Sequence, residues 1–255
     1  MFPPSRSPSR RWLETWLPTR CCLCQAPCPA GPAVCRACRL RLPYIETDAV
    51  CRFCARPVAP DVEAVFSGLP PRQFDRTACA LCDYERPPID GLRALFRYQS
   101  PVDAWIPQLK FHGGLATARL LGELFVARAK TLQWPMPDRI LPLPLHSTRL
   151  GERGFEQPLE LARPLARGLG LPLDGESLHR VRQTRRQSEM DMEQRQSNLA
   201  SAFSASFTTI KGNLPSFVAI IDDVFTTGAT VGEAALAVRA AGVPRVEAWV
   251  MAVTE

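Results

Sequence analysis

Cysteine placement constrains this chain more than any other feature of its sequence. All ten cysteines of the 255 residues lie between Cys21 and Cys82. Two thiolates separated by two residues can reach one tetrahedral zinc ion from a tight turn, and two such pairs complete a four-thiolate shell. The chain contains four C-x-x-C units, which predict one or two structural zinc ions; the expected ligands are Cys21, Cys24, Cys35, Cys38, Cys51, Cys54, Cys79 and Cys82.

The sequence leaves the pairing of these units open. The simplest arrangement joins the first two units in one site and the last two in another, and interleaved pairing is the alternative. Cys22 can replace Cys21, and Cys28 has no obvious partner. Buried or redox-active thiols explain one or two C-x-x-C units but not four within about sixty residues. Iron–sulfur clusters use other spacings. A full thiolate shell leaves no open position, so the zinc sites should be structural.

Composition divides the chain into three parts. Residues 1–20 form a basic amino-terminal segment, and residues 21–86 are rich in Cys, Pro and Arg, so we expect this zinc module to need its metal as a staple. Residues 87–91 are typical of a turn, and a larger domain is expected over 91–255. No apolar run has the length of a signal peptide or a membrane helix, which favours a cytoplasmic protein. The cytoplasm is reducing, so its thiols are available for metal.

Beyond residue 91, strand and helix patterns alternate. The expected strands span residues 92–98, 139–145, 217–221 and 245–253, and the expected helices 116–133, 156–169 and 230–241. The second strand should enter a loop at Pro142, and Pro164 should kink the second helix. This alternation predicts an α/β domain with a mainly parallel sheet. Residues 183–206 are polar and arginine-rich, which favours an insertion outside the core.

Arginine supplies nearly all of the positive charge. The net charge is +6, and only Lys110, Lys130 and Lys211 are lysines. The planar guanidinium suits phosphate oxygens. A coding bias toward arginine gives the same composition without any ligand, and the sequence does not separate the two explanations.

The segment around Asp222 and Asp223 carries the clearest functional pattern. A buried strand delivers these two acids at its carboxyl end, where ligands sit on open α/β sheets. A short loop and a helix follow, so free backbone N–H groups and the positive end of the helix form an anion site. The carboxylates can then accept hydrogen bonds from ribose hydroxyls. The expected phosphate-binding residues are Thr226, Thr227, Gly228, Ala229 and Thr230.

The alternative interpretation of this segment is structural. Asp222 and Asp223 would then cap the end of a strand, and Thr-Thr-Gly would be an ordinary helix start. Taken alone, Thr-Thr-Gly favours that interpretation, but the preceding strand, the paired acids and the following helix favour a ligand site. P-loop and Rossmann glycine patterns are absent from the sequence.

The same segment closely resembles the ribose-phosphate signature of type I phosphoribosyltransferases. From Cys21 to Val253 the chain resembles the ComF family of competence-related, phosphoribosyltransferase-like proteins. The resemblance also rests on the two amino-terminal C-x-x-C pairs, on Leu109-Lys-Phe-His-Gly113, on Leu141-Pro-Leu-Pro-Leu-His146 with Arg149 and Arg153-Gly-Phe-Glu-Gln157, and on Arg180, Thr184, Gln187, Arg195 and Asn198. Glu156 stands where the family has asparagine.

This resemblance implies a type I phosphoribosyltransferase fold preceded by a small zinc-ribbon-like module. It also implies a ligand, 5-phosphoribosyl 1-diphosphate, whose pyrophosphate would lie near Lys110, Arg149 and Arg153. Mg²⁺ would bridge the pyrophosphate and the ribose hydroxyls. The insertion at 183–206 would act as a hood, with Gln187 and Arg195 facing the ligand.

Three functions follow as hypotheses. The first is phosphoribosyl transfer to a nitrogen nucleophile in nucleotide metabolism linked to DNA uptake, with Asp222 and Asp223 as the catalytic pair. The second is a competence factor that binds incoming single-stranded DNA and contacts the uptake machinery, with Arg36, Arg39, Arg41, Arg52 and Arg56 extending a basic track. The third is a ligand sensor or scaffold that has lost turnover.

Overall fold

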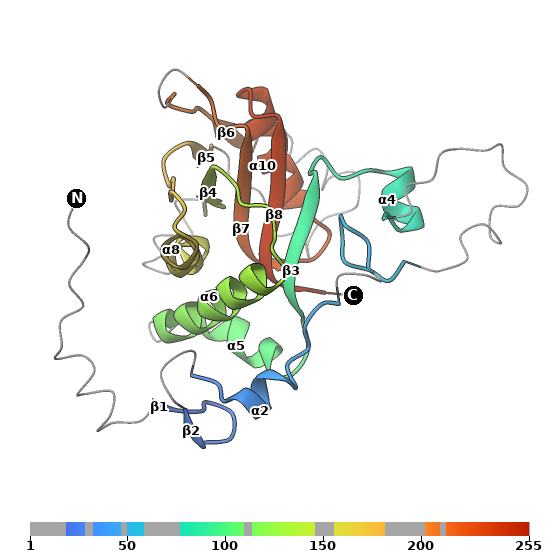
Figure 1. The fold of residues 1–255 in the computed structure, drawn as a ribbon. Helices are drawn as coiled ribbons and strands as arrows, with labels where there is room; N and C mark the ends of the chain where they lie inside the picture. The colour runs from blue at the N-terminus through green and yellow to red at the C-terminus, as the bar shows by residue number, and fades with distance from the viewer. Residues whose placement is uncertain are drawn as a thin grey trace, which may run out of the picture. The chain divides into compact units, whose positions relative to one another are not determined.

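A computed structural model gives the fold of the chain (Figure 1). It describes residues 19–28, 33–46, 50–58, 77–109, 114–145, 156–181, 202–209 and 213–254. The chain forms two compact units, Met1–Leu42 and Pro43–Glu255. The first four-cysteine group belongs to the small unit and the second to the large unit. The expected division into a zinc module at 21–86 and a domain at 91–255 stays a prediction.

The small unit consists of a β-hairpin and one helical turn in its described part. Strand β1 (Thr19–Arg20) pairs antiparallel with β2 (Pro27–Cys28), and the short helix α2 (Arg36–Arg39) follows Cys35. The first C-x-x-C unit lies in the turn between the two strands, and the second spans the start of α2. These tight turns bring two pairs of thiols close together.

A parallel sheet forms the centre of the large unit. Its strands are β3 (Gly91–Arg97), β4 (Arg139–Pro142), β7 (Phe217–Phe225) and β8 (Arg245–Val253), in the order β3-β8-β7-β4. All three pairings are parallel. Strands β7 and β8 are central and almost wholly apolar, because both of their faces are covered. This confirms the expected α/β class with a parallel sheet.

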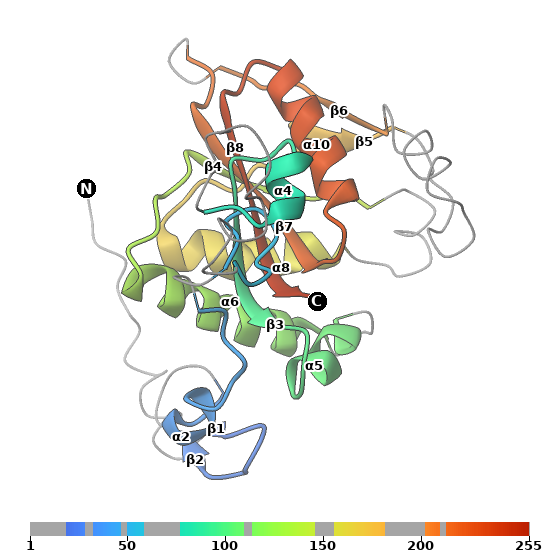
Figure 2. The same ribbon diagram turned by 90° about the vertical axis from the view of Figure 1, so that its right-hand side faces the viewer.

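Helices cover both faces of the sheet (Figures 1 and 2). Helices α6 (Gly114–Thr131) and α8 (Gln157–Leu169) pack together on one face, and α10 (Ala229–Ala240) and the short α4 (Ala80–Tyr84) lie on the other. A Cβ atom on Gly122 of α6 would come within 2.4 Å of Pro164 of α8. The two helices can approach closely because that glycine has no side chain.

The expected elements match the structure closely, with three differences. Pro142 ends β4 as expected, and Pro164 lies inside α8, which continues to Leu169. Strand β7 continues to Phe225, so the two acids lie within the strand and not beyond it. Helix α5 (Val102–Gln108) was not expected. Strands β5 (Leu178–Arg180) and β6 (Phe203–Ala205) form an antiparallel pair, so residues 203–205 of the expected insertion belong to a strand.

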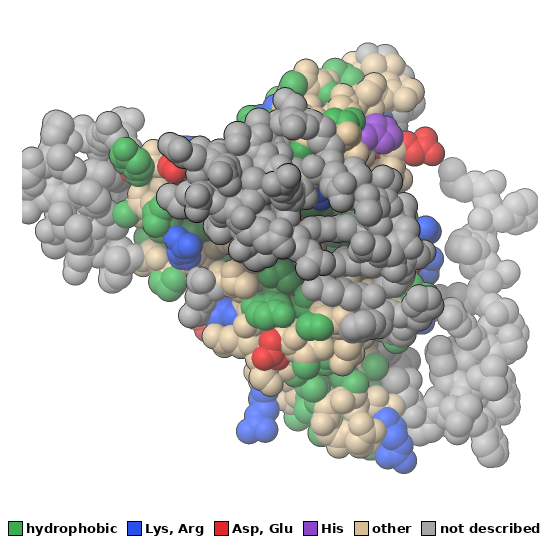
Figure 3. Space-filling model, turned by 180° about the vertical axis from the view of Figure 1, so that it is seen from behind, with side chains coloured by type: hydrophobic (Ala, Val, Ile, Leu, Met, Phe, Trp, Pro, Cys, Tyr) green, Lys and Arg blue, Asp and Glu red, His purple; other side chains and the backbone are tan. Residues whose placement is uncertain are grey.

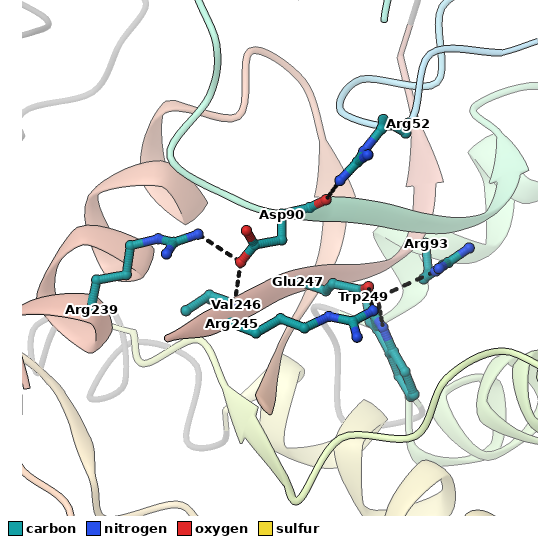
Figure 4. Close-up of polar contacts among 8 residues, drawn as sticks. All are labelled: Arg52, Asp90, Arg93, Arg239, Arg245, Val246, Glu247 and Trp249. Atoms are coloured by element: carbon teal, nitrogen blue, oxygen red, sulfur yellow. Dashed lines mark hydrogen bonds and ion pairs between the residues drawn. The ribbon is translucent and has the colours of Figure 1, made fainter. Parts of the chain in front are cut away.

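A charged network closes the amino-terminal edge of the sheet (Figure 4). Glu247 of β8 is only 2% exposed, and it accepts hydrogen bonds from Arg93 at 3.3 Å, Arg245 at 2.7 Å and the Trp249 indole at 3.2 Å. Trp249 in turn packs against Phe125 of α6, with 5.4 Å between the ring centres. The buried carboxylate is therefore satisfied by three donors, as a buried charge must be.

None of the described helices has the length and apolarity that crossing a membrane requires.

Candidate functional site

The candidate site begins near the carboxyl end of β7, where this strand leaves the buried core. Phe217 to Ile221 are buried, and Asp222 and Asp223 are half-buried. Asp222 pairs in register with Val250 of β8, which places both acids at the carboxyl edge of the parallel sheet. The structure thus brings the acids to the edge where ligands of such sheets bind.

The two acids influence each other. The N–H of Asp223 donates to Asp222 Oδ1 at 2.8 Å, and the N–H of Val224 donates to Asp223 Oδ1 at 2.7 Å. Burial and the neighbouring Asp223 charge raise the pKa of Asp222 well above its usual range, and the charge of Arg180 acts in the opposite direction. A group that donates hydrogen bonds or carries positive charge is therefore favoured beside Asp222.

The loop after β7 presents backbone N–H groups. Gly228 adopts a left-handed conformation with φ of 76° and precedes the first residue of α10. The Ala229 N–H lies 3.4 Å from the Thr227 hydroxyl, a long hydrogen bond. Within the described part of the chain, no hydrogen-bond acceptor is found for the N–H groups of Thr226, Thr227, Gly228 and Thr230. The loop can therefore offer its amides to an anion at the positive end of α10.

The Phe225 ring packs against this loop at Gly228 and constrains its shape. A Cβ atom on Gly228 would lie 2.3 Å from Phe225 Cζ, closer than any side chain permits. Phe225 itself is buried at the end of β7. A glycine is thus required at position 228 for two reasons: the left-handed backbone conformation and the close approach of the Phe225 ring.

The other predicted ligand-binding residues cannot be placed. Lys110, Arg149, Arg153, Gln187 and Arg195 lie outside the described residues. Glu156 is described and precedes α8, where its side chain makes no capping hydrogen bond. Arg180, which matched a family position without an assigned role, acts electrostatically on Asp222. Its match to that family position was the only sequence signal for it.

The cysteines form two groups with the simplest pairing. In one group Cys24 Sγ and Cys35 Sγ are 3.6 Å apart, and in the other Cys54 Sγ and Cys79 Sγ are 3.6 Å apart. The four sulfurs of each group lie within 4.8 Å of one another. A tetrahedral zinc ion with Zn–S bonds of about 2.3 Å separates its sulfurs by roughly 3.8 Å. Each group could therefore bind a structural zinc ion.

The remaining two cysteines stand outside these groups. Cys22 is exposed and Cys28 is buried, and neither belongs to a four-sulfur group. Among the ligands, a hydrogen bond from the Cys54 thiol lowers the pKa of Cys51 to about 4, although burial opposes this effect. The thiolate, which is the metal-binding form, is thereby favoured at Cys51.

The second cysteine group is bonded directly to the sheet. The Leu92 N–H of β3 donates to the Arg52 carbonyl at 2.7 Å, and the Arg52 guanidinium donates to the Asp90 carbonyl at 2.7 Å. The Asp90 carboxylate accepts from Arg239 of α10 at 2.6 Å and from the Val246 N–H of β8 at 2.7 Å (Figure 4). The turn between Cys51 and Cys54 is thus hydrogen-bonded to the amino-terminal end of β3.

Comparison with known proteins finds relatives over most of the chain. The DNA utilization protein YhgH of Salmonella typhi is 34% identical over 223 residues, which cover 86% of this chain and 96% of the relative. Competence protein F of Haemophilus influenzae is 32% identical over 185 residues, 71% of this chain and 80% of the relative. Competence protein ComFC of Bacillus subtilis is 27% identical over 214 residues, 79% of this chain and 76% of the relative. No family model matches the chain.

Proposed function

The chain belongs to the ComF family, and on that premise we propose that it binds the ribose 5-phosphate group of 5-phosphoribosyl 1-diphosphate at the loop after Asp222 and Asp223. The observation that carries this proposal is the set of loop N–H groups without described acceptors, directly after two acids on one strand. The phosphate would accept from these N–H groups and from the threonine hydroxyls, and the carboxylates would accept from the ribose hydroxyls.

Mg²⁺ fits the chemistry of this site. The two carboxylates supply oxygen ligands of the kind that Mg²⁺ takes together with substrate phosphates, and the ion would neutralise charge on the pyrophosphate. Asp222 and Asp223 would orient the ribose and hold it in place by accepting hydrogen bonds from its hydroxyls.

We propose that the reaction is transfer of the phosphoribosyl group. The bond between C1 of the ribose and the pyrophosphate oxygen breaks, a nitrogen of the acceptor forms the new bond to C1, and the acceptor loses a proton. The transition state resembles an oxocarbenium ion, so negative charge near the sugar stabilises it. Asp222 and Asp223 would supply that charge, and the loop would fix the position of the sugar.

The names of the relatives add a physiological setting. One group is named for DNA utilization and two relatives for competence, which favours a role of this site in the uptake or use of DNA. The proposed link is nucleotide metabolism that accompanies incoming DNA.

Removal of both carboxylates tests the proposed ligand. Titration calorimetry of the Asp222→Asn, Asp223→Asn double variant with Mg²⁺ and 5-phosphoribosyl 1-diphosphate should show no binding, whereas the wild-type protein should bind. Asp103→Asn, which changes an exposed acid in the first turn of α5, is the control and should bind like wild type. Equal affinity of the double variant and the wild type would refute the site.

A second candidate function is binding of single-stranded DNA, which the names of the relatives favour. Arg36 and Arg41 in the small unit and Arg56 in the large unit are exposed, as phosphate contacts require. Arg52 is exposed but hydrogen-bonded to Asp90 and stacked on Phe53. Figure 3 shows Lys and Arg side chains exposed at several places on one face among the described residues.

A mobility-shift titration separates the two candidates. A single-stranded oligonucleotide should be shifted at low salt and released steeply as salt rises if the arginines contact phosphates. The Arg36→Gln, Arg41→Gln, Arg56→Gln variant should then reduce the slope of this dependence. The absence of any shift at low salt would remove the second candidate and leave the first untouched.

A further inference from the structure

A proline packs against the helix that carries the candidate anion site. Pro88 lies in the segment between α4 and β3, and Gly232 lies in the first turn of α10. A Cβ atom on Gly232 would lie 3.2 Å from Pro88 Cγ and 3.3 Å from Pro88 Cδ. The proline ring therefore contacts the backbone of α10 at a position without a side chain. Gly232 also closes the first helical turn after the loop, because its N–H donates to the Gly228 carbonyl at 2.7 Å.

The same segment binds the other end of α10. Arg239, in the last turn of this helix, donates from Nε to the Pro88 carbonyl at 3.2 Å and from a terminal nitrogen to the Asp90 carboxylate at 2.6 Å (Figure 4). Gly232 and Arg239 are about two helical turns apart and so face the same side of α10. Residues 88–90 therefore contact α10 near both of its ends and fix its direction.

The second cysteine group holds this segment from its other side. Arg52, in the turn between two of the cysteines, donates to the Asp90 carbonyl at 2.7 Å. Cys82 and Ile89 are buried in the same apolar cluster as Val231, which lies in the first turn of α10. The cysteine group, residues 88–90 and the start of α10 therefore belong to one packed region of the large unit.

We propose that Pro88 is a positioning residue of the ribose-phosphate loop and that the second cysteine group supports the loop through it. The Pro88 ring contacts Gly232 and thereby holds the first turn of α10, whose N–H groups would bind the phosphate. The ligand in this statement rests on the proposed function, but the contact exists in the ligand-free protein. The first cysteine group belongs to the other compact unit and provides a control.

The direct test measures hydrogen exchange in the absence of ligand. Pro88→Ala removes the two ring carbons that contact α10 and should raise the exchange rate of the Gly232 amide by about three- to tenfold, the size of effect expected when a coupling contact is lost. The Leu143 amide, bonded to the Ile221 carbonyl in the sheet at 2.9 Å, should exchange as in the wild type. Pro135→Ala, at an exposed proline before β4, is the control and should leave both amides unchanged. An equal rise at Leu143 would overturn the proposal, because Pro88 would then act on global stability.

Ligand binding provides the second readout. Calorimetry with Mg²⁺ and 5-phosphoribosyl 1-diphosphate should show an affinity about three- to tenfold lower for Pro88→Ala than for the wild type. Gly232→Ala crowds the ring in the wild type but fills the space that the ring leaves in Pro88→Ala. The glycine substitution should therefore cost less affinity in the Pro88→Ala background than in the wild type. Additive losses would show that the two residues act independently and would overturn the positioning role.

Two serine variants compare the cysteine groups. Cys82→Ser and Cys38→Ser each replace the last cysteine of one group. Cys82→Ser should raise Gly232 exchange as Pro88→Ala does, and Cys38→Ser should leave it at the wild-type rate. Equal Gly232 exchange in the two serine variants would refute the role of the second group. If Cys82→Ser does not fold, Arg52→Gln takes its place, because it removes the hydrogen bond to the segment that carries Pro88.

The two proposals fail separately. A wild-type protein that binds no donor, while Pro88→Ala still raises Gly232 exchange, would refute the proposed ligand and support the role of Pro88 in holding the loop. Unchanged Gly232 exchange in Pro88→Ala would refute the positioning role whatever the donor does.

Discussion

Two glycines of this chain share a backbone conformation but differ in their surroundings. Gly228 has φ of 76° and Gly170, which ends α8, has φ of 70°. A Cβ atom on Gly170 would meet nothing within 4 Å, whereas one on Gly228 would meet the Phe225 ring. The comparison separates the cost of a left-handed backbone from the cost of a steric clash. The Phe225 ring next to Gly228 therefore excludes a side chain at this position of the loop.

Replacing each glycine by alanine should therefore give unequal losses of stability. Gly170→Ala should lower the free energy of unfolding by about 1 kcal/mol, the cost of a left-handed alanine. Gly228→Ala should lose about 2 to 4 kcal/mol, because displacing Phe225 adds an overpacking cost. Urea denaturation measures both values. Equal losses would show that Phe225 moves aside freely and does not shape the loop.

A buried ion pair holds the β5–β6 pair to the sheet. Arg139, the first residue of β4, donates to Asp174 Oδ2 at 2.9 Å and to the Thr208 carbonyl at 3.0 Å. Asp174 precedes β5 and Thr208 follows β6, so one arginine binds the chain on both sides of the strand pair. Asp174 also accepts from the Ser177 hydroxyl at 2.7 Å. The side chains of Arg139 and Asp174 are only 9% and 13% exposed.

This ion pair should contribute to stability in a pH-dependent way. Burial acts to raise the pKa of Asp174, but hydrogen bonds from Ser177 and Arg139 outweigh it and lower the pKa. A lowered folded-state pKa gives stability that is present above the ordinary value of about 3.9 and is lost as the pH falls through the folded-state value. Asp174→Asn should cost about 3 kcal/mol near pH 7 and less in acid, measured by urea denaturation across pH.

An exposed pair is the control for this measurement. Glu123→Gln removes the partner of Arg119 on the outer face of α6, where the arginine is 68% exposed, and should cost less than about 0.5 kcal/mol. A pH-independent loss in Asp174→Asn would contradict the assigned role of the carboxylate.

At the scale of the whole molecule, the two four-cysteine groups belong to different compact units. The cysteines of the first group lie on a small hairpin and a helical turn. The second is bonded through Arg52 to the start of β3, and Phe53 beside it is buried in the main apolar cluster of the large unit. Disruption of the two groups should therefore have different consequences.

Serine variants of one ligand from each group should show this difference. Cys21→Ser and Cys51→Ser should each reduce the zinc content from about two ions per chain to about one, measured by elemental analysis. Only Cys51→Ser should increase hydrogen exchange at the Leu92 amide, since that amide is bonded to the adjacent Arg52. Equal exchange in both variants would mean that the second cysteine group does not support β3.

Much of this architecture was predictable because the local signals are strong. The apolar runs within β7 and β8, at residues 217–221 and 249–253, predicted the two central strands to within a few residues. The C-x-x-C spacing predicted the candidate ligands, and the structure groups the four units in the simpler of the two pairings that the sequence left open. The acid pair and its loop were recognisable from residues next to each other in the chain.

What the sequence did not reveal depends on contacts between distant residues. The three-residue strands β5 and β6 are too short for a periodic pattern and exist because they pair across the insertion. The effect of Arg180 on Asp222 joins residues about forty positions apart, and no local rule encodes it. Phe225 beneath Gly228 is close in sequence, but only the turn of the backbone shows that the two meet.

The bonding of Arg52 to the edge of the sheet limits how this protein can be divided or recombined. A fragment that began at Gly91 would leave the Leu92 amide without its acceptor and would lose Asp90, the shared acceptor for Arg239 and Val246. Gene fusions, deletions or exchanges of the cysteine-containing segment among related chains should therefore keep residues 50–90 with the sheet. The second cysteine group is therefore an integral part of the large unit.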